Sequence, residues 1–252
     1  MQKTFYRKMQ IFMQKIVIII MLLFSLPALS QQTEGKNEVK LNLSAFVFKG
    51  FHLQYERQVS PKVTVALGYG MIPVSSIPFK STISKEVYIP NVNISEYRAG
   101  SSVFTPEIRF YFGKKGAFHG FYLAPYARFG FYKINGPVAF SNSANQSERA
   151  DFSGKFHAIT GGLLIGSSWQ LSDKFYLDCW LAGGSFGGES GKFTAVAALM
   201  PDDQTALKKS LNSVSLRGVS LTSEVNSSGA IVKTSGSMVG LRGLGVNIGY
   251  RF

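Results

Sequence analysis

The most regular feature of the chain is a two-residue alternation of apolar with polar or small side chains, clearest at the C-terminus. Leu244, Val246, Ile248, Tyr250 and Phe252 would share one face of a strand, and glycine, asparagine and arginine stand between them. Successive side chains of a strand point to opposite faces. Because about nine to eleven tilted residues cross a bilayer, this segment has the pattern and length of a transmembrane β-strand.

The same alternation recurs in seven earlier segments. They cover residues 39–47, 51–56, 63–71, 107–112, 121–131, 162–171 and 175–182. Three residues depart from it, namely Pro125 on an outward face and Leu164 and Trp180 on inward faces. About eight strands are therefore predicted, and closing them into a barrel leaves no sheet edge exposed to lipid.

The connections between these segments alternate in length, which supports the same topology. The short ones cover residues 59–62, 113–120 and 172–174. The long and polar ones lie near 74–101, 133–154 and 185–236, and the first connection, near Lys49 and Gly50, is again short. Outer-membrane barrels have short periplasmic turns and longer outer loops. The sequence thus predicts a closed antiparallel up-and-down transmembrane β-barrel with both termini in the periplasm.

The last long connection carries a helix signal. Pro201 is followed by two acidic residues, which favours a helix start, and Leu207, Leu211 and Val214 then fall on one face. We expect a short amphipathic helix on the barrel mouth. A disordered loop is the alternative.

The first 30 residues have the order of a secretory signal peptide. Four basic residues precede an apolar run over residues 16–26, and the small-x-small pattern of residues 27–30 stands before Gln31. The apolar run is short for a helix that spans a membrane, which takes about 20 residues. We therefore expect a cleaved segment at 1–30 and a barrel domain at 31–252; an uncleaved anchor is the alternative.

The composition changes the list of expected partners. The net charge of +13 falls to +9 without residues 1–30, because 23 basic residues then stand against 14 acidic ones. A basic chain suggests nucleic acid, but these charges are scattered and the chain is exported, so no nucleic-acid partner is expected. The expected partners are outer-membrane lipid and lipopolysaccharide, and the barrel assembly machinery through the C-terminal Ile248, Tyr250 and Phe252. Other protein partners remain open.

Four segments together resemble a known family. They are residues 54–57 (Gln-Tyr-Glu-Arg), 105–116 (with Pro-Glu-Ile-Arg), 120–128 (with Tyr-Leu-Ala-Pro-Tyr) and 248–252. They are similar to small outer-membrane barrels of Bacteroidetes-type bacteria that are classified as a domain of unknown function. The resemblance implies the fold and the location. It supplies no activity, so it assigns no catalytic residues.

Seven charged residues fall on inward faces of the predicted barrel. They are Lys40, Glu56, Glu107, Arg109, Arg128, Asp178 and Arg251. The lumen of an eight-stranded barrel is just wide enough for side chains to fill it, and an isolated buried charge costs several kcal/mol. We therefore expect a structural ion-pair network that plugs the barrel. A narrow conduit for small solutes is the alternative.

Two further alternatives stay open. A lipid-modifying enzyme would need a nucleophilic serine and a histidine base, and the chain offers only His52, His119 and His157. A soluble periplasmic barrel that binds an apolar ligand would need the charged face outside. The favoured function is a non-enzymatic outer-membrane barrel that presents surface loops for structural or binding roles, with no catalytic residues, metal or cofactor.

Overall fold

A computed structural model describes residues 35–78, 80, 93–141, 147–214 and 218–252 of the chain. The predicted signal peptide at 1–30 lies outside the described residues, as do residues 79 and 81–92 of the predicted loop at 74–101.

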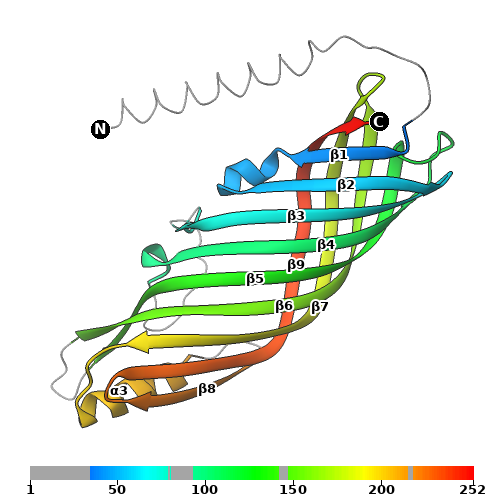
Figure 1. The fold of residues 1–252 in the computed structure, drawn as a ribbon. Coiled ribbons are helices and arrows are strands. Elements are labelled where there is room, and N and C mark those ends of the chain that lie inside the picture. The colour runs from blue at the N-terminus through cyan, green and yellow to red at the C-terminus, as the bar shows by residue number, and fades with distance from the viewer. Residues whose placement is uncertain (1–34, 79, 81–92, 142–146, 215–217) are drawn as a thin grey trace, which may run out of the picture. The chain divides into compact units, whose positions relative to one another are not determined.

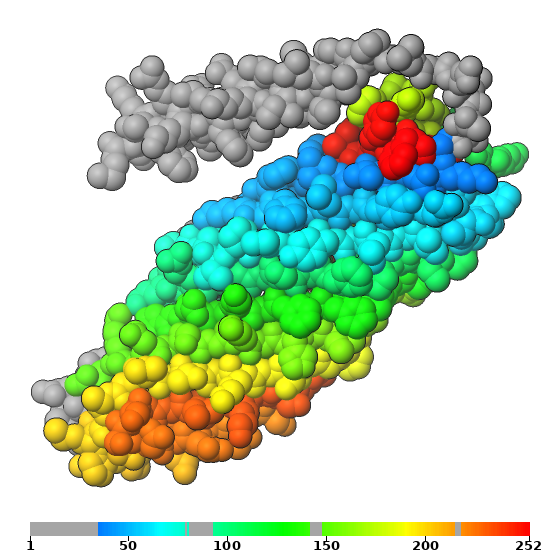
Figure 2. Space-filling view, in the orientation of Figure 1, coloured from blue at the N-terminus to red at the C-terminus, as the bar shows by residue number. Residues whose placement is uncertain are grey.

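The described chain forms one antiparallel sheet that closes on itself (Figure 1). Its strands are β1 (Asn37–Asn42), β2 (Phe51–Ser60), β3 (Val63–Ser76), β4 (Arg98–Tyr111), β5 (Gly120–Ser141), β6 (Ser147–Gln170), β7 (Phe175–Val196), β8 (Val219–Asn226) and β9 (Gly229–Arg251). Strands β1 to β7 pair in chain order, β7 pairs with β9, and β9 pairs back onto β1. Figure 2 shows this order on the surface, from β1 in blue to β7 in yellow. The predicted barrel is confirmed, and β8 is an additional strand on β9.

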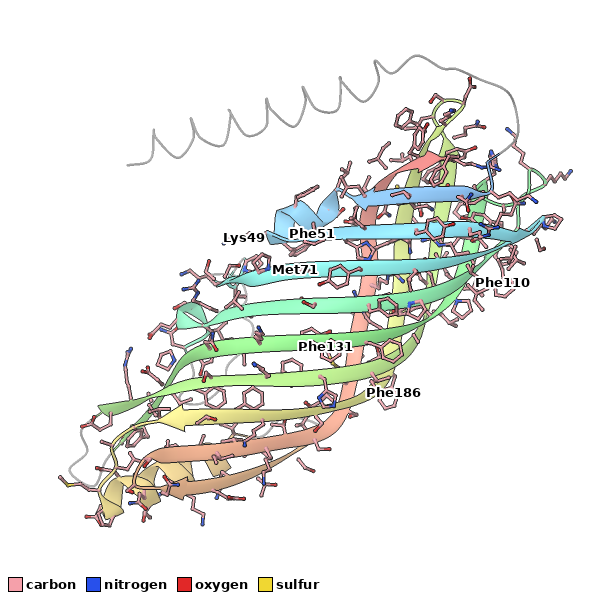
Figure 3. The ribbon with its side chains drawn as sticks, in the orientation of Figure 1. Lys49, Phe51, Met71, Phe110, Phe131 and Phe186 are labelled. Carbon is pink, nitrogen blue, oxygen red and sulfur yellow. The ribbon has the colours of Figure 1, made fainter. Side chains whose placement is uncertain are left out.

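The outer face of the barrel is apolar and its interior is charged. The phenylalanines labelled in Figure 3 come from β2, β4, β5 and β7, and their exposed fractions lie between 36% and 65%. Lys40, Glu56, Arg109 and Asp178 are each 0% exposed. A soluble protein has the opposite arrangement, whereas a transmembrane barrel turns apolar residues to lipid and polar ones inward.

Two of the predicted loops are largely strand. Residues 133–154 belong mostly to β5 and β6, and residues 185–236 contain the end of β7, all of β8 and the start of β9. The apolar alternation fades there because outward positions carry polar side chains such as Lys133 and Lys155. Four strands therefore continue far beyond the apolar outer face. We call this part, residues 133–154 and 189–236, the extension.

The first predicted strand, 39–47, is wrong in its second half. β1 ends at Asn42, and Ser44–Phe48 forms a 3₁₀ helix, η1. The Asn42 side chain accepts a hydrogen bond from the Ala45 backbone N–H and donates one to Asn247. Asparagine side chains that bond nearby backbone in this way compete with strand pairing, so the ladder stops here.

The predicted amphipathic helix is confirmed as α3 (Pro201–Asn212). Leu207 and Leu211 are 0% and 3% exposed and pack in a cluster with Phe193 of β7 and Val232 of β9. The helix thus adds a small apolar core to the extension. No helix in the described part of the chain is both long and apolar enough to cross a membrane.

Candidate functional site

The most concentrated chemistry of the protein is a layer of charged side chains across the lumen, with Arg109 of β4 at its centre. One guanidinium nitrogen, Nη1, lies 2.9 Å from Glu56 and 2.5 Å from Asp178, and Nη2 lies 2.5 Å from Glu107. Lys40 Nζ lies 2.6 Å from both Glu56 and Asp178. Strands from opposite sides of the barrel are thereby joined through their side chains.

The strand register makes room for these long side chains. On β3, Ala66 stands opposite both Glu56 of β2 and Glu107 of β4. Lys40 of β1 stands opposite Gly249 of β9. Small inward residues beside large charged ones let the layer fill a narrow lumen, as expected for an eight-stranded barrel.

Neutral side chains donate further hydrogen bonds to three carboxylates of the layer, whereas neither oxygen of Glu38 has a hydrogen-bond partner among the described residues. Tyr111 and Thr64 hydroxyls donate to Glu56 at 2.8 and 2.6 Å, and the Tyr122 hydroxyl donates to Asp178 at 2.7 Å. On the far side of Arg109, the Gln54 amide donates to Glu107 at 2.8 Å. Buried ions are tolerated when such partners satisfy their remaining bonding capacity, so these contacts make the layer a stable plug.

An aromatic layer closes the lumen toward the short turns. The turn between β4 and β5 places Phe118 inside the barrel at 0% exposure, with its ring centre 6.2 Å from Tyr111 and 6.4 Å from Tyr176. The Arg251 guanidinium lies 4.6 Å from the Phe118 ring centre and donates to the Tyr176 hydroxyl at 3.0 Å. The interior is therefore filled from this end through the charged layer.

Five of the seven predicted lumen residues meet in the charged layer: Lys40, Glu56, Glu107, Arg109 and Asp178. Arg251 belongs to the aromatic layer instead. Arg128 forms no ion pair with any residue that the structure describes, and its Nε has no hydrogen-bond partner there. The ion pairs of the layer therefore join five of the seven predicted residues, while Arg251 contacts Phe118 and Tyr176.

Two charged residues of the layer were not predicted. Glu38 lies 3.4 Å from Lys40 and is 0% exposed, but it precedes the first apolar position of its strand. Arg242 lies 2.6 Å from Glu107, although strict alternation places it on the lipid side. A distortion of β9 at Leu244, whose φ is 53°, reverses the alternation of inward and outward side chains and turns Arg242 inward, while the pairing with β7 keeps one register. The sequence signal was an arginine, between Leu241 and Gly243, at a position expected to be apolar.

The C-terminal residues proposed as an assembly signal lie away from the lumen. Tyr250 and Phe252 are 39% and 52% exposed, and their ring centres are 6.2 Å apart. Ile248 stands between Leu41 of β1 and Leu177 of β7. Their role in assembly stays a prediction.

Neither His157 nor His119 stands in a catalytic arrangement with other described residues. His157 is exposed and forms no hydrogen bond to a serine or a carboxylate in the described ranges, while His119 contacts the Ala117 carbonyl and Gln170. Residues 183–187 read Gly-x-Ser-x-Gly, but Ser185 lies within β7 and not on the strand-to-helix turn that exposes a nucleophile in hydrolases. Over the same residues, no cluster of three or more potential metal ligands occurs.

The charged layer predicts a large difference between two arginines. Arg109→Ala leaves three buried carboxylates short of a partner and is expected to destabilise the barrel by about 3–5 kcal/mol. Arg149→Ala removes an exposed ion pair with Glu96 and is expected to cost about 0–1 kcal/mol. The temperature at which the folded band disappears on a gel run after stepwise heating measures both. Equal temperatures for the two variants would contradict the assignment.

Comparison with solved structures finds outer-membrane proteins. A major outer-membrane protein from Thermus thermophilus is 11% identical, with a TM-score of 0.36, over 86% of this chain and 99% of that one. CarO2 of Acinetobacter baumannii is 10% identical with a TM-score of 0.37, and the N-terminal β-barrel domain of Pseudomonas aeruginosa OprF is 12% identical with a TM-score of 0.26; each match covers 88% of this chain and 100% of the other.

A comparison with curated proteins finds no match. The family comparison does: residues 16–221, most of the chain, match the profile described as "Protein of unknown function (DUF3575)". The expected resemblance to a family of unknown function is thereby confirmed, and the chain belongs to the DUF3575 family.

Proposed function

We propose that the protein is a non-enzymatic outer-membrane barrel that is closed to solutes and holds its extension, with α3 and β8, at the cell surface. The charged layer carries this proposal. Its side chains cross the lumen and are 0–3% exposed, except Arg242 at 6%. A conduit for small solutes needs a continuous wet path, and the paired ions together with Phe118 occupy that path.

A row of lysines supports the orientation. Lys133 of β5 stands directly opposite Lys155 of β6, which stands opposite Lys192 of β7, and all three are exposed on the outer face. Like charges directly opposite each other destabilise a sheet, so the row is stabilised when anions bind between the lysines. Phosphate groups of lipopolysaccharide are such anions, and they lie at the cell-surface side of the outer membrane.

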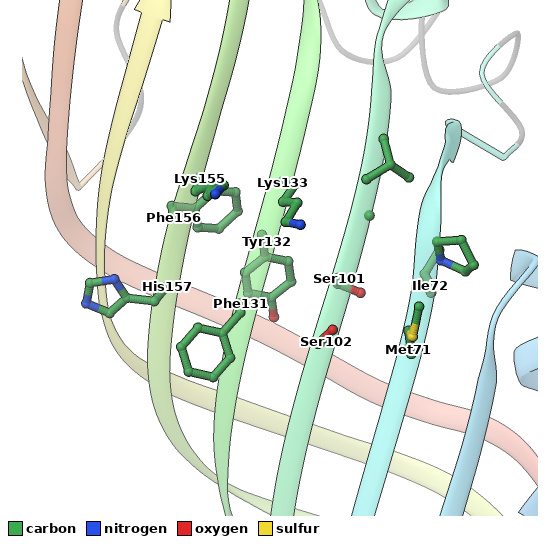
Figure 4. A pocket seen from close by; sticks show the side chains of 13 residues that line it. Met71, Ile72, Ser101, Ser102, Phe131, Tyr132, Lys133, Lys155, Phe156 and His157 are labelled. Carbon is green, nitrogen blue, oxygen red and sulfur yellow. The ribbon is translucent and has the colours of Figure 1, made fainter.

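The lysine row also lies where a bilayer boundary is expected. Phe131 and His157 lie on the same outer face two residues before Lys133 and two residues after Lys155 along their strands, and Figure 4 shows the four side chains around one pocket. On β5 the apolar Phe131 thus gives way to Lys133 within one step of the alternation, and on β6 Ile159 gives way to His157 and then Lys155. In this orientation the extension faces outward, and the short turns and the C-terminus face the periplasm.

Whether the lumen is closed to ions and small solutes is tested by electrical recording. The purified chain is inserted into a planar bilayer and compared with an open porin inserted in the same way. We expect no stable unitary steps from the chain, because the charged layer blocks the lumen. Reproducible steps of one size would overturn the plugged barrel and favour the conduit.

Orientation is tested by labelling in intact cells. In a Cys179→Ser background, Lys208→Cys places a thiol on exposed α3 and Lys115→Cys places one in the short β4–β5 turn. A membrane-impermeant maleimide is expected to label the first variant and to label the second only after the cells are broken. The reverse result would invert the orientation.

Lipopolysaccharide binding is tested by neutralising the row. A variant with Lys133, Lys155 and Lys192 all changed to glutamine is expected to keep less lipopolysaccharide through detergent purification. Changing Lys62, Lys114 and Lys115 to glutamine removes the same charge near the short turns and serves as the matched control. Equal retention by both variants argues against the row as the binding site.

A further inference from the structure

The wall of the barrel is incomplete beside β1. β1 has six residues, fewer than the roughly nine to eleven that a transmembrane strand needs. Beyond it, η1 replaces the strand, and β2 begins only at Phe51. Figure 1 shows β1 and η1 at one end of β9, with β8 at the other end.

The edge of β9 is correspondingly unpaired. β9 pairs with β1 through Asn247–Arg251 and with β8 through Gly229–Gly236. Leu43 and Ser44 still bond to β9 at Val246 and Leu244. Over 238–243, β9 has a strand partner, β7, on one side only among the residues described here. We call the space between this edge and η1 the side opening.

Apolar side chains border the side opening. Leu241 and Leu244 of β9 are each 89% exposed, and Phe48 of η1 and Phe51 of β2 are 46% and 36% exposed. Unpaired backbone groups are costly in hydrocarbon. The border of the side opening therefore combines apolar side chains with unpaired backbone groups of β9. This combination suits a ligand that has both an alkyl chain and polar atoms.

A cavity of about 440 Å³ lies behind this border, within the size range of small-molecule pockets. Its deep wall is formed by His52, Arg128, Trp180 and Arg242. Three of these are at least nine-tenths buried, with exposed fractions of 9% for His52, 8% for Trp180 and 6% for Arg242. The cavity therefore joins an apolar border to a polar interior.

Several nitrogens on this wall have no partner among the described residues. They are His52 Nδ1, Arg128 Nε, Trp180 Nε1 and Arg242 Nη2. Buried polar groups are nearly always hydrogen-bonded, so each orphan needs an explanation. One guanidinium nitrogen of Arg242, Nη1, forms an ion pair with Glu107. The guanidinium also lies 4.1 Å from the Trp180 ring centre and 4.9 Å from that of Tyr126. Its remaining nitrogen is thus held in a fixed position.

The charges nearest to these unpartnered nitrogens favour an anion. Glu107 is the acidic residue that contacts Arg242, and it also pairs with Arg109. Arg128 adds a second cation without an ion-pair partner in the described chain. Guanidinium groups bind carboxylate and phosphate oxygens through directed, charge-assisted hydrogen bonds.

We propose that the side opening and its cavity bind a single-chain amphipathic anion, whose carboxylate or phosphate head lies against Arg242 and Arg128 while its alkyl chain passes between Leu241, Leu244 and Phe48. The ligand enters sideways from the bilayer and not along the plugged lumen. This inference needs the barrel to lie in a bilayer, but it does not depend on which end faces outward.

Trp180 supplies the readout, because the chain has only two tryptophans and Trp169 lies on the outer face. In a Trp169→Phe background, the full chain is placed in phosphatidylcholine vesicles and titrated with dibrominated stearate, whose bromines quench tryptophan. Saturable quenching of Trp180 is expected. The methyl ester of the same acid lacks the charge and is expected to give only weak, non-saturating quenching.

A second probe separates the two head groups. Lysophosphatidic acid with the same brominated chain carries a phosphate. Saturable quenching by the stearate alone assigns a carboxylate ligand, by the lysophosphatidic acid alone a phosphate ligand, and by both an anion site that accepts either head. No saturation with either anion, or equal quenching by the ester, would overturn the proposal.

Variants test the named residues. Arg242→Gln and Arg128→Gln are each expected to weaken binding about tenfold, the loss of a hydrogen bond to a charged group. Arg128→Gln breaks no ion pair within the described chain, so it stays informative if Arg242→Gln fails to fold. Arg57→Gln removes the same charge from the outer face of β2 and is expected to bind as the parent does. Ala45→Phe fills the cavity border and is expected to abolish saturation. If both lumen variants titrated like Arg57→Gln, the arginines would not be the site.

Discussion

The structure depends on one constraint: a closed sheet with lipid outside must place its charges in a lumen too narrow to hold water around them. Arg109 meets this constraint with contacts to Glu56, Glu107 and Asp178, which come from three different strands. Each carboxylate then has a neutral donor as well, such as Tyr122 for Asp178. The pairing is therefore a property of the whole ring and not of any one strand pair.

Closing the ring and filling the lumen are linked at β1. Lys40 reaches Glu56 and Asp178 from this strand, so β1 has to pair with both β2 and β9 at that level. Two residues later the Asn42 side chain ends the strand by bonding to Ala45 and Asn247. The sheet is thus complete where the charged layer requires it and open immediately beyond.

The sequence predicted the parts of the fold on which lipid acts, because lipid allows only apolar side chains on one face and so imposes a strict alternation. The sequence-based prediction failed where the wall no longer faces lipid. In the extension the outward face is polar, so the strands through Lys133 and Lys192 looked like loops, although the inward face holds an apolar core with Phe193 and Val232. At β1, a side-chain hydrogen bond of Asn42 decided the end of the strand. At β9, the distortion at Leu244 reversed the face of Arg242. Alternation alone predicted that Glu56, Glu107 and Asp178 point inward with Arg109. No local sequence pattern, however, shows that Arg128 forms no ion pair with the described residues.

The interior has two levels. The lower one is the charged layer, and the upper one lies toward the extension, at the height of the side opening. The lower level sets four carboxylates, Glu38, Glu56, Glu107 and Asp178, against Lys40, Arg109 and Arg242, so that its cations are all engaged. The upper level adds Arg128, which forms no ion pair with any residue that the structure describes. With Arg128 the two levels hold four cations against four carboxylates, but Arg128 forms no ion pair with any of these carboxylates, so an anionic head group can pair with it directly. Since the charged layer blocks the lumen toward the short turns and the side opening lies at the upper level, the anion reaches Arg128 through the wall, where its own alkyl chain can remain in the hydrocarbon.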